Sequence, residues 1–214
     1  SSTSRGLGDV YKRQGLFSLI GLPYVWKFLW SPLLDRYSLP LLIYRPGLRR
    51  SWMLSTQLLL LITIAMLGFL DPLIHLWYIA WLCLGIAFLS ATQDIVLDAY
   101  RRQILPDQEL GLGNSIHVNA YRVAGLVPGS LSFILSDFLP WDIVFVVTSA
   151  FVLVGIILTL SVSEPNSNHN QPATLRAAII DPFDDFLSRQ GVKQAFLILL
   201  SLIHISEPTR RRGI

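Results

Sequence analysis

Charge is scarce in this sequence. Lys, Arg, Asp and Glu together make up 14% of the 214 residues, whereas hydrophobic residues make up 52%. A typical soluble domain carries about 25% charged residues, so this composition argues against that class and indicates that lipid is the main solvent. Cysteine is almost absent as well. Cys83 stands alone, which excludes a disulfide within the chain and gives no indication of a cysteine-based metal site.

Catalytic signatures are also missing. The sequence contains no HExxH zinc motif, no GxSxG nucleophile elbow and no phosphate-binding loop, and its paired carboxylates have no histidines at metal-ligand spacing. We therefore expect no enzymatic activity, no catalytic residue, no cofactor and no metal site.

Both ends of the chain resemble translated adaptor sequence from a sequencing library. One coding of residues 4–14 (SRGLGDVYKRQ) resembles a transposon-type adaptor, and its reverse complement translates to LSLIHISEPTR, which is the sequence of residues 200–210. We therefore expect residues 1–14 and 200–214 to be non-native and exclude them from reasoning about the fold. These ends carry six basic and two acidic residues, so removing their +4 from the formal net charge of +3 leaves −1. The charge balance then gives no support for a nucleic-acid partner.

Long apolar runs organise the rest of the chain. Each is about 20 residues long, the length of a helix that crosses the hydrocarbon core of a bilayer at 1.5 Å per residue. None shows the alternating pattern of a barrel strand, so we expect an all-α membrane protein. A polar segment, residues 164–190, follows the fifth run, and a sixth run begins at residue 191. The five complete runs cover residues 15–34, 52–70, 76–97, 113–136 and 143–162.

The connections between the runs alternate in charge. Three of them contain arginine and the two between these contain none, which predicts by the positive-inside rule that the first, third and fifth connections are cytoplasmic. The polar segment 164–190 is then either a cytoplasmic linker between two helical units or an ordinary long loop. The arginines are Arg36, Arg45, Arg49 and Arg50 in the first connection, Arg101 and Arg102 in the third, and Arg176 and Arg189 in the fifth.

Four charged residues lie within or beside the apolar runs, where an unpaired charge is costly. Lys27 lies midway along the first run and either attracts an anionic substrate group or pairs with a carboxylate on another helix. Asp94 and Asp98 are four residues apart, on one face of a predicted helix. We expect Asp94, the deeper of the two, to bind a proton, and Asp98 to pair with Arg102.

The fourth charged position, Arg122, lies in the run that also contains the GxxxG motif of Gly125 and Gly129. Its guanidinium suits bidentate capture of a substrate carboxylate, and a structural pair with Asp94 or Asp98 is the alternative. The small residues of the motif favour a close helix contact.

Three motifs carry a resemblance to a known family. YVWKFLWSPLLDRY at residues 24–37, GLRRSW at 47–52 and SATQDIVLDAYRRQILPDQELG at 90–111 resemble the AmpG-type anhydromuropeptide permeases of the major facilitator superfamily. The resemblance implies a partial N-terminal half of a major facilitator-type helical bundle. Residues 15–163 would form helices 2–6, residues 164–190 the cytoplasmic central loop, and residues 191–199 the start of helix 7.

The resemblance also implies a function. We expect proton-driven import of peptidoglycan-derived anhydromuropeptides across the bacterial inner membrane by a multi-pass, monomeric transporter, with this fragment inactive alone. Cargo and protons would contact Lys27, Asp94 and Arg122. Alternatives are a permease for another anionic solute such as acetyl-CoA, and an integral-membrane enzyme or assembly protein. The superfamily further implies a gating charge cluster formed by Asp35, Arg36, Asp98, Arg101 and Arg102.

Overall fold

The structure is a computed structural model, and it describes residues 19–37, 39 and 47–164 together with scattered positions between residues 180 and 201. The chain divides into two units, residues 1–169 and 170–214. In the second unit the described positions are helical, apart from a turn at Gly191. The predicted non-native ends lie almost entirely outside the described residues, as does most of the predicted central loop.

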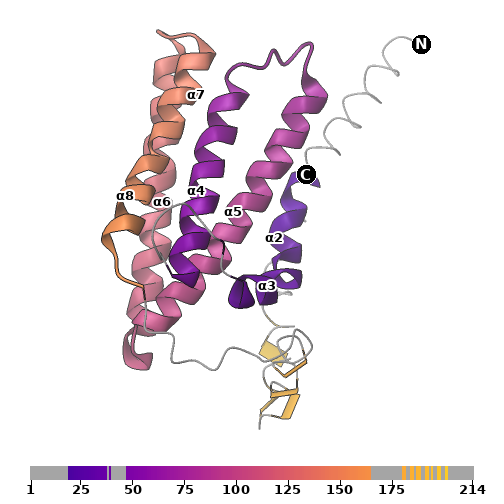
Figure 1. Cartoon of the computed structure of the whole chain (residues 1–214), viewed down its shortest axis with the longest axis vertical. Coiled ribbons are helices and arrows are strands. Elements are labelled where there is room, and N and C mark those ends of the chain that lie inside the picture. The colour runs from indigo at the N-terminus through magenta and orange to yellow at the C-terminus, as the bar shows by residue number, and fades with distance from the viewer. Residues whose placement is uncertain are drawn as a thin grey trace, which may run out of the picture. The chain divides into compact units, whose positions relative to one another are not determined.

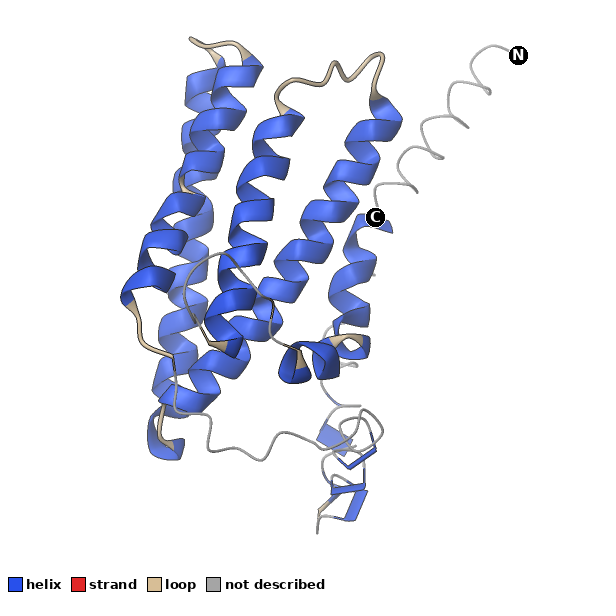
Figure 2. Cartoon of the chain, in the orientation of Figure 1, coloured by secondary structure: helices blue, strands red, loops and turns tan. Residues whose placement is uncertain are grey.

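Every regular element of the described residues is helical, as the sequence predicts (Figure 2). Four helical stretches are long and apolar enough to cross a membrane, and they match the second to fifth predicted runs. These stretches are α4 (Leu48–Leu67), α5 (Leu76–Ile104), η3 (Asp107–Glu109) continued by α6 (Leu110–Ser136), and α7 (Trp141–Ala150) continued by α8 (Val152–Ser161).

The first predicted run differs from expectation. Its described part is a series of short segments rather than one spanning helix: η1 (Leu19–Gly21), α2 (Leu22–Trp26), η2 (Lys27–Leu29) and α3 (Ser31–Arg36). Pro23 and Pro32 occupy the first turns of α2 and α3. Proline is tolerated in a first turn, but it cannot donate the backbone hydrogen bond that would continue a preceding helix, so each proline favours a new segment.

α5 extends seven residues beyond its predicted end at residue 97. The added turns contain Asp98, Arg101 and Arg102, so these residues are helical rather than part of a connection. Two arginines in a last turn interact favourably with the negative end of the helix dipole. Hydropathy alone therefore places the end of this helix too early.

α4 is the central helix of the first unit. It packs against α5 on one side and against α7 and α8 on the other, while α2 packs against α5 and α6 packs against α7 (Figure 1). Polar side chains join these helices. Gln57 of α4 donates from Nε2 to Oγ1 of Thr159 in α8 at 3.0 Å, and Ser132 of α6 bonds Thr148 of α7 at 2.7 Å. Such bonds hold helices together in lipid, where apolar burial gives little driving force.

The predicted close contact at the GxxxG motif is not present in the described residues. A Cβ added at Gly125 or Gly129 would have no described atom within 4 Å, so neither glycine lies against a neighbouring helix there. The buried core lies instead between α3, α4 and α5, where Leu34, Met53 and Val96 are almost completely buried. This core fixes α3 beside α5 and so positions the charged residues on both.

Candidate functional site

The first charge pair joins Lys27 and Asp94. Nζ of Lys27 in η2 lies 2.6 Å from Oδ2 of Asp94 in α5, and about a third of each side chain is exposed. This contact corresponds to the ion-pair alternative for Lys27, and it brings together two of the three residues that the sequence assigns to cargo and protons. An unpaired charge is costly where lipid surrounds the helices, and this contact gives each side chain a partner of opposite charge.

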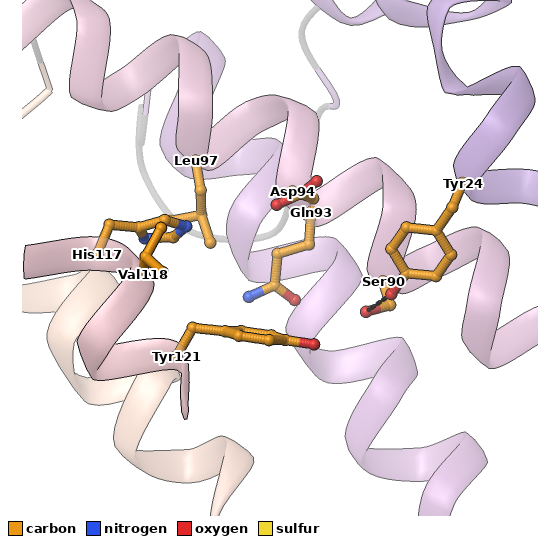
Figure 3. Close-up of a pocket in the computed structure, with 8 residues that line it drawn as sticks. All are labelled: Tyr24, Ser90, Gln93, Asp94, Leu97, His117, Val118 and Tyr121. Atoms are coloured by element: carbon orange, nitrogen blue, oxygen red, sulfur yellow. Dashed lines mark hydrogen bonds between the residues drawn. The ribbon is translucent and has the colours of Figure 1, made fainter. Parts of the chain in front are cut away.

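A cavity of about 380 Å³ lies beside this ion pair, between α2, α5 and α6 (Figure 3). Residues of α5 form its polar side, and Asp94 is among them. At one side of the cavity the hydroxyl of Tyr24 in α2 donates to Oγ of Ser90 in α5 at 2.7 Å. The lining residues are Tyr24, Ser90, Gln93, Asp94, Leu97, His117, Val118 and Tyr121.

His117 brings a third titratable group to the two aspartates. One ligand atom each of Asp94, Asp98 and His117 lie within 4.8 Å of one another, which is the arrangement of a small metal site. Each carboxylate already has a cationic partner, however, since Lys27 lies 2.6 Å from Asp94 and Arg101 lies 2.7 Å from Asp98. A metal would have to displace both partners, so the donor set fits an ion-pair network better than a metal centre.

Arg122 stands apart from these pairs. It is exposed on α6 and does not line the cavity, although its neighbour Tyr121 does. Within the described residues it pairs with neither Asp94 nor Asp98, so the structural-pair alternative is not formed.

Of the five residues of the predicted gating cluster, only Asp98 and Arg101 pair with each other among the described residues. Asp35 pairs with Arg49 at 2.6 Å, Asp98 with Arg101 at 2.7 Å, and Arg102 with Asp107 at 3.5 Å. The predicted pair of Asp98 with Arg102 is thus wrong. Arg102 pairs instead with Asp107 at the start of η3, and Asp98 pairs with Arg101, which lies about one turn further along α5.

Arg36 has a different neighbour. Its guanidinium lies over the ring of Tyr37, 5.8 Å from the ring centroid. A cation in this position is attracted to the face of the aromatic ring. The ion pair that contains Asp35 nevertheless lies close to the ion pair that contains Arg102. Arg49, the partner of Asp35, and Arg102 line the same cavity of about 450 Å³.

Two residues of this region were not singled out from the sequence. Arg49 is 7% exposed and is the partner of Asp35. Glu164 accepts hydrogen bonds from the backbone N–H groups of Arg49 at 2.8 Å and Arg50 at 3.1 Å, and so caps the first turn of α4. The excess of arginine in the first connection hinted at Arg49. No local pattern predicts a cap supplied from 115 residues away.

Comparisons with known proteins show which proteins the chain resembles. Residues 14–206 match the model of the Major Facilitator Superfamily. The chain is 45% identical over 193 residues to the anhydromuropeptide permease of Escherichia coli K12, which covers 90% of this chain and 38% of that protein. It is 50% identical over 192 residues to an uncharacterized protein of Haemophilus influenzae, covering 88% of this chain and 44% of that protein. The chain thus spans less than half the length of these relatives.

Proposed function

Because this chain belongs to the Major Facilitator Superfamily of membrane transporters, we propose that it forms part of a proton-driven importer of anhydromuropeptides in the bacterial inner membrane. Its membership of that superfamily makes it a multi-pass membrane protein and a transporter component rather than an enzyme. The proposed cargo rests on the name of the E. coli relative, which shares 45% of the aligned residues. The proposed partners are this cargo, protons and the bilayer, and the proposed state is a monomer.

The observation that carries the proposal is the Lys27–Asp94 pair at the edge of the cavity. In the empty transporter each charge satisfies the other. A proton that binds Asp94 cancels the carboxylate charge and leaves the ammonium of Lys27 unpaired. A carboxylate of the cargo then replaces Asp94 as its partner, so cargo and proton bind together.

Arg122 supplies a second cation for the same cargo. Its guanidinium is exposed and unpaired among the described residues, and it follows the cavity residue Tyr121 in α6. A planar guanidinium binds a carboxylate through two parallel hydrogen bonds. Anhydromuropeptides carry several carboxylates, so one can meet Lys27 and another Arg122.

Alternating access requires contacts that form in one state and break in the other. The pairs of Asp35 with Arg49 and of Asp98 with Arg101 are the proposed contacts of this kind. They lie near the end of α5 that the arginine pattern assigns to the cytoplasm. Opening of the transporter towards the cytoplasm would exchange these partners.

We further infer that the chain holds helices 2–6 and the start of helix 7 of a longer protein, and that it does not transport alone. Its coverage of less than half of its relatives supports this division. Sequencing the intact gene across both ends should reveal one helix before residue 15 and at least six apolar runs after residue 190. A reading frame that stops soon after residue 199 would contradict it.

Uptake measurements test the proposed activity. The test protein is a chimera in which residues 15–164 replace the matching segment of the E. coli anhydromuropeptide permease. It is reconstituted in vesicles. An inward proton gradient should drive accumulation of labelled anhydromuropeptide, and a protonophore should abolish it. Uptake of acetyl-CoA but not of anhydromuropeptide would replace the proposed cargo, and uptake insensitive to the protonophore would exclude proton coupling.

A further inference from the structure

Two tyrosines face the cavity from different helices. Tyr24 of α2 and Tyr121 of α6 both line it, and the polar residues Ser90 and Gln93 of α5 lie between them (Figure 3). This arrangement combines aromatic faces with amide and hydroxyl groups in one space. Neither ring is needed for the Lys27–Asp94 pair, so the charged residues do not explain them.

Among the described residues, Tyr121 takes neither of the usual roles of a tyrosine in a membrane helix. It lies near the middle of the 27-residue α6, far from the interfaces where aromatic rings anchor a helix. Its side chain is not part of the packed core either, since the residue is 75% exposed. A buried or lipid-facing phenol needs a hydrogen-bond partner, and the hydroxyl of Tyr121 has none among the described residues. Tyr121 therefore offers the face of its ring to the cavity.

Tyr24 differs from Tyr121 because its hydroxyl is already engaged. It donates to Oγ of Ser90 at 2.7 Å, which holds the ring in place at the side of the cavity. Tyr24 therefore offers its ring face rather than its hydroxyl. Because the ring is already held in place, ligand binding costs little side-chain conformational entropy at Tyr24.

Gln93 supplies the polar complement. Its carboxamide points towards the Tyr121 ring (Figure 3) and has no hydrogen-bond partner among the described residues. A carboxamide both donates and accepts hydrogen bonds. The acetamido group of an N-acetylated sugar needs one acceptor and one donor, and the C–H face of a pyranose ring packs on an aromatic face.

From this geometry we propose that Tyr121 and Tyr24 form a sugar subsite that takes an N-acetylhexosamine ring of the cargo. The inference rests on the proposed function for the identity of the cargo. It divides the ligand between two regions: the sugar packs against the tyrosines, and the carboxylates of the peptide reach Lys27 and Arg122. The ring of Tyr121 then determines specificity for the sugar and leaves proton coupling to Asp94.

Direct binding separates this inference from the transport activity. The probe is the peptide-free disaccharide N-acetylglucosaminyl-anhydro-N-acetylmuramic acid, titrated into the purified chimera by calorimetry. Tyr121→Leu should weaken its binding about tenfold because the aromatic face that packs on the sugar is lost, while Tyr121→Phe should stay within about threefold because the ring remains. The control is Tyr78→Leu, an exposed tyrosine in the first turn of α5 outside the cavity, and it should bind as the parent does.

Each outcome has one meaning. Unchanged disaccharide binding in Tyr121→Leu, with a monodisperse protein on size-exclusion chromatography, would overturn the sugar subsite. Equal losses in Tyr121→Leu and Tyr121→Phe would assign the effect to the hydroxyl and overturn stacking. Failure of the parent chimera to bind the disaccharide would also overturn it. A parent that binds the disaccharide through Tyr121 but does not accumulate anhydromuropeptide would leave the subsite standing and refute the proposed transport.

Discussion

The carboxylate of Glu164 caps the first turn of α4, where its Oε1 accepts the backbone N–H of Arg49 at 2.8 Å. The second carboxylate oxygen accepts the N–H of Arg50 at 3.1 Å. The side chain of Arg50 in turn donates to the carbonyls of Thr159 and Leu160 at the end of α8. The start of α4 and the end of α8 are thus tied together at the point where the predicted central loop begins.

Glu164→Ala should reduce the free energy of unfolding of the chimera by about 1 kcal/mol, because two N–H groups lose their cap and the helix dipole loses a negative charge. Thermal unfolding measures this change. The control is Asp137→Ala at the C-terminal end of α6, where a carboxylate caps no helix N-terminus, and it should be neutral. A Glu164→Ala protein as stable as the parent would show that water replaces the cap fully.

Gly47→Ala should be more damaging than a loss of the cap. Gly47 has φ +85°, which strains any residue with a Cβ, and an added Cβ would collide with the side chain of Glu164. We expect a loss of about 1–3 kcal/mol in thermal unfolding. The matched control is Gly85→Ala inside α5, where an added Cβ meets open space and alanine is the better helix former.

A second variant divides the cost at Gly47 into its parts. In the background of Glu164→Ala the collision is removed but the strained φ remains, so Gly47→Ala should cost less there than in the parent. Equal costs in the two backgrounds would mean that backbone strain alone is responsible.

Asp94→Asn should abolish accumulation driven by the proton gradient and spare exchange of labelled for unlabelled cargo. Asparagine resembles the protonated acid in shape but cannot release a proton, so the cavity binds cargo without coupling. Flux measurements in vesicles containing the chimera distinguish the two modes. Asp71→Asn, in the connection between α4 and α5, is the control and should accumulate normally. Unaltered accumulation by Asp94→Asn would assign coupling to another group.

Arg122→Lys should raise the KM for anhydromuropeptide about tenfold and change the maximal rate little. Lysine keeps the charge but replaces the two parallel hydrogen bonds of a guanidinium with a single point charge, and about 1.4 kcal/mol of lost binding corresponds to a factor of ten. Initial uptake rates over a range of cargo concentrations measure it. An unchanged KM would rule out bidentate capture by Arg122.

Apolar run length predicted three of the four membrane-spanning stretches well. The bilayer sets how many residues must be apolar, so α4, α6 and the α7–α8 pair begin and end within four residues of the predicted positions. α5 was predicted less well, because its last turns are polar and are stabilised by charge rather than by lipid. The first run was misjudged because hydropathy does not register Pro23 and Pro32, which divide it into segments.

The candidate site was predictable only in its components. A lysine and an aspartate in apolar runs each required a partner, and that cost is visible in the sequence. Which partner each found depended on packing, since Lys27 and Asp94 are 67 residues apart. Gln93 carries no charge and so gave no comparable signal.

The amino-acid sequence by itself determined that the chain lies in lipid, that it is helical and which family it resembles. Composition, run length and local motifs can all be read along the chain without knowing which segments meet in space. Only the tertiary structure decided that Asp35 meets Arg49, that Glu164 caps α4 and that two tyrosines share a cavity. These contacts join segments between 14 and 115 residues apart. They depend on which helix faces pack together, and periodicity along one helix does not specify its neighbour.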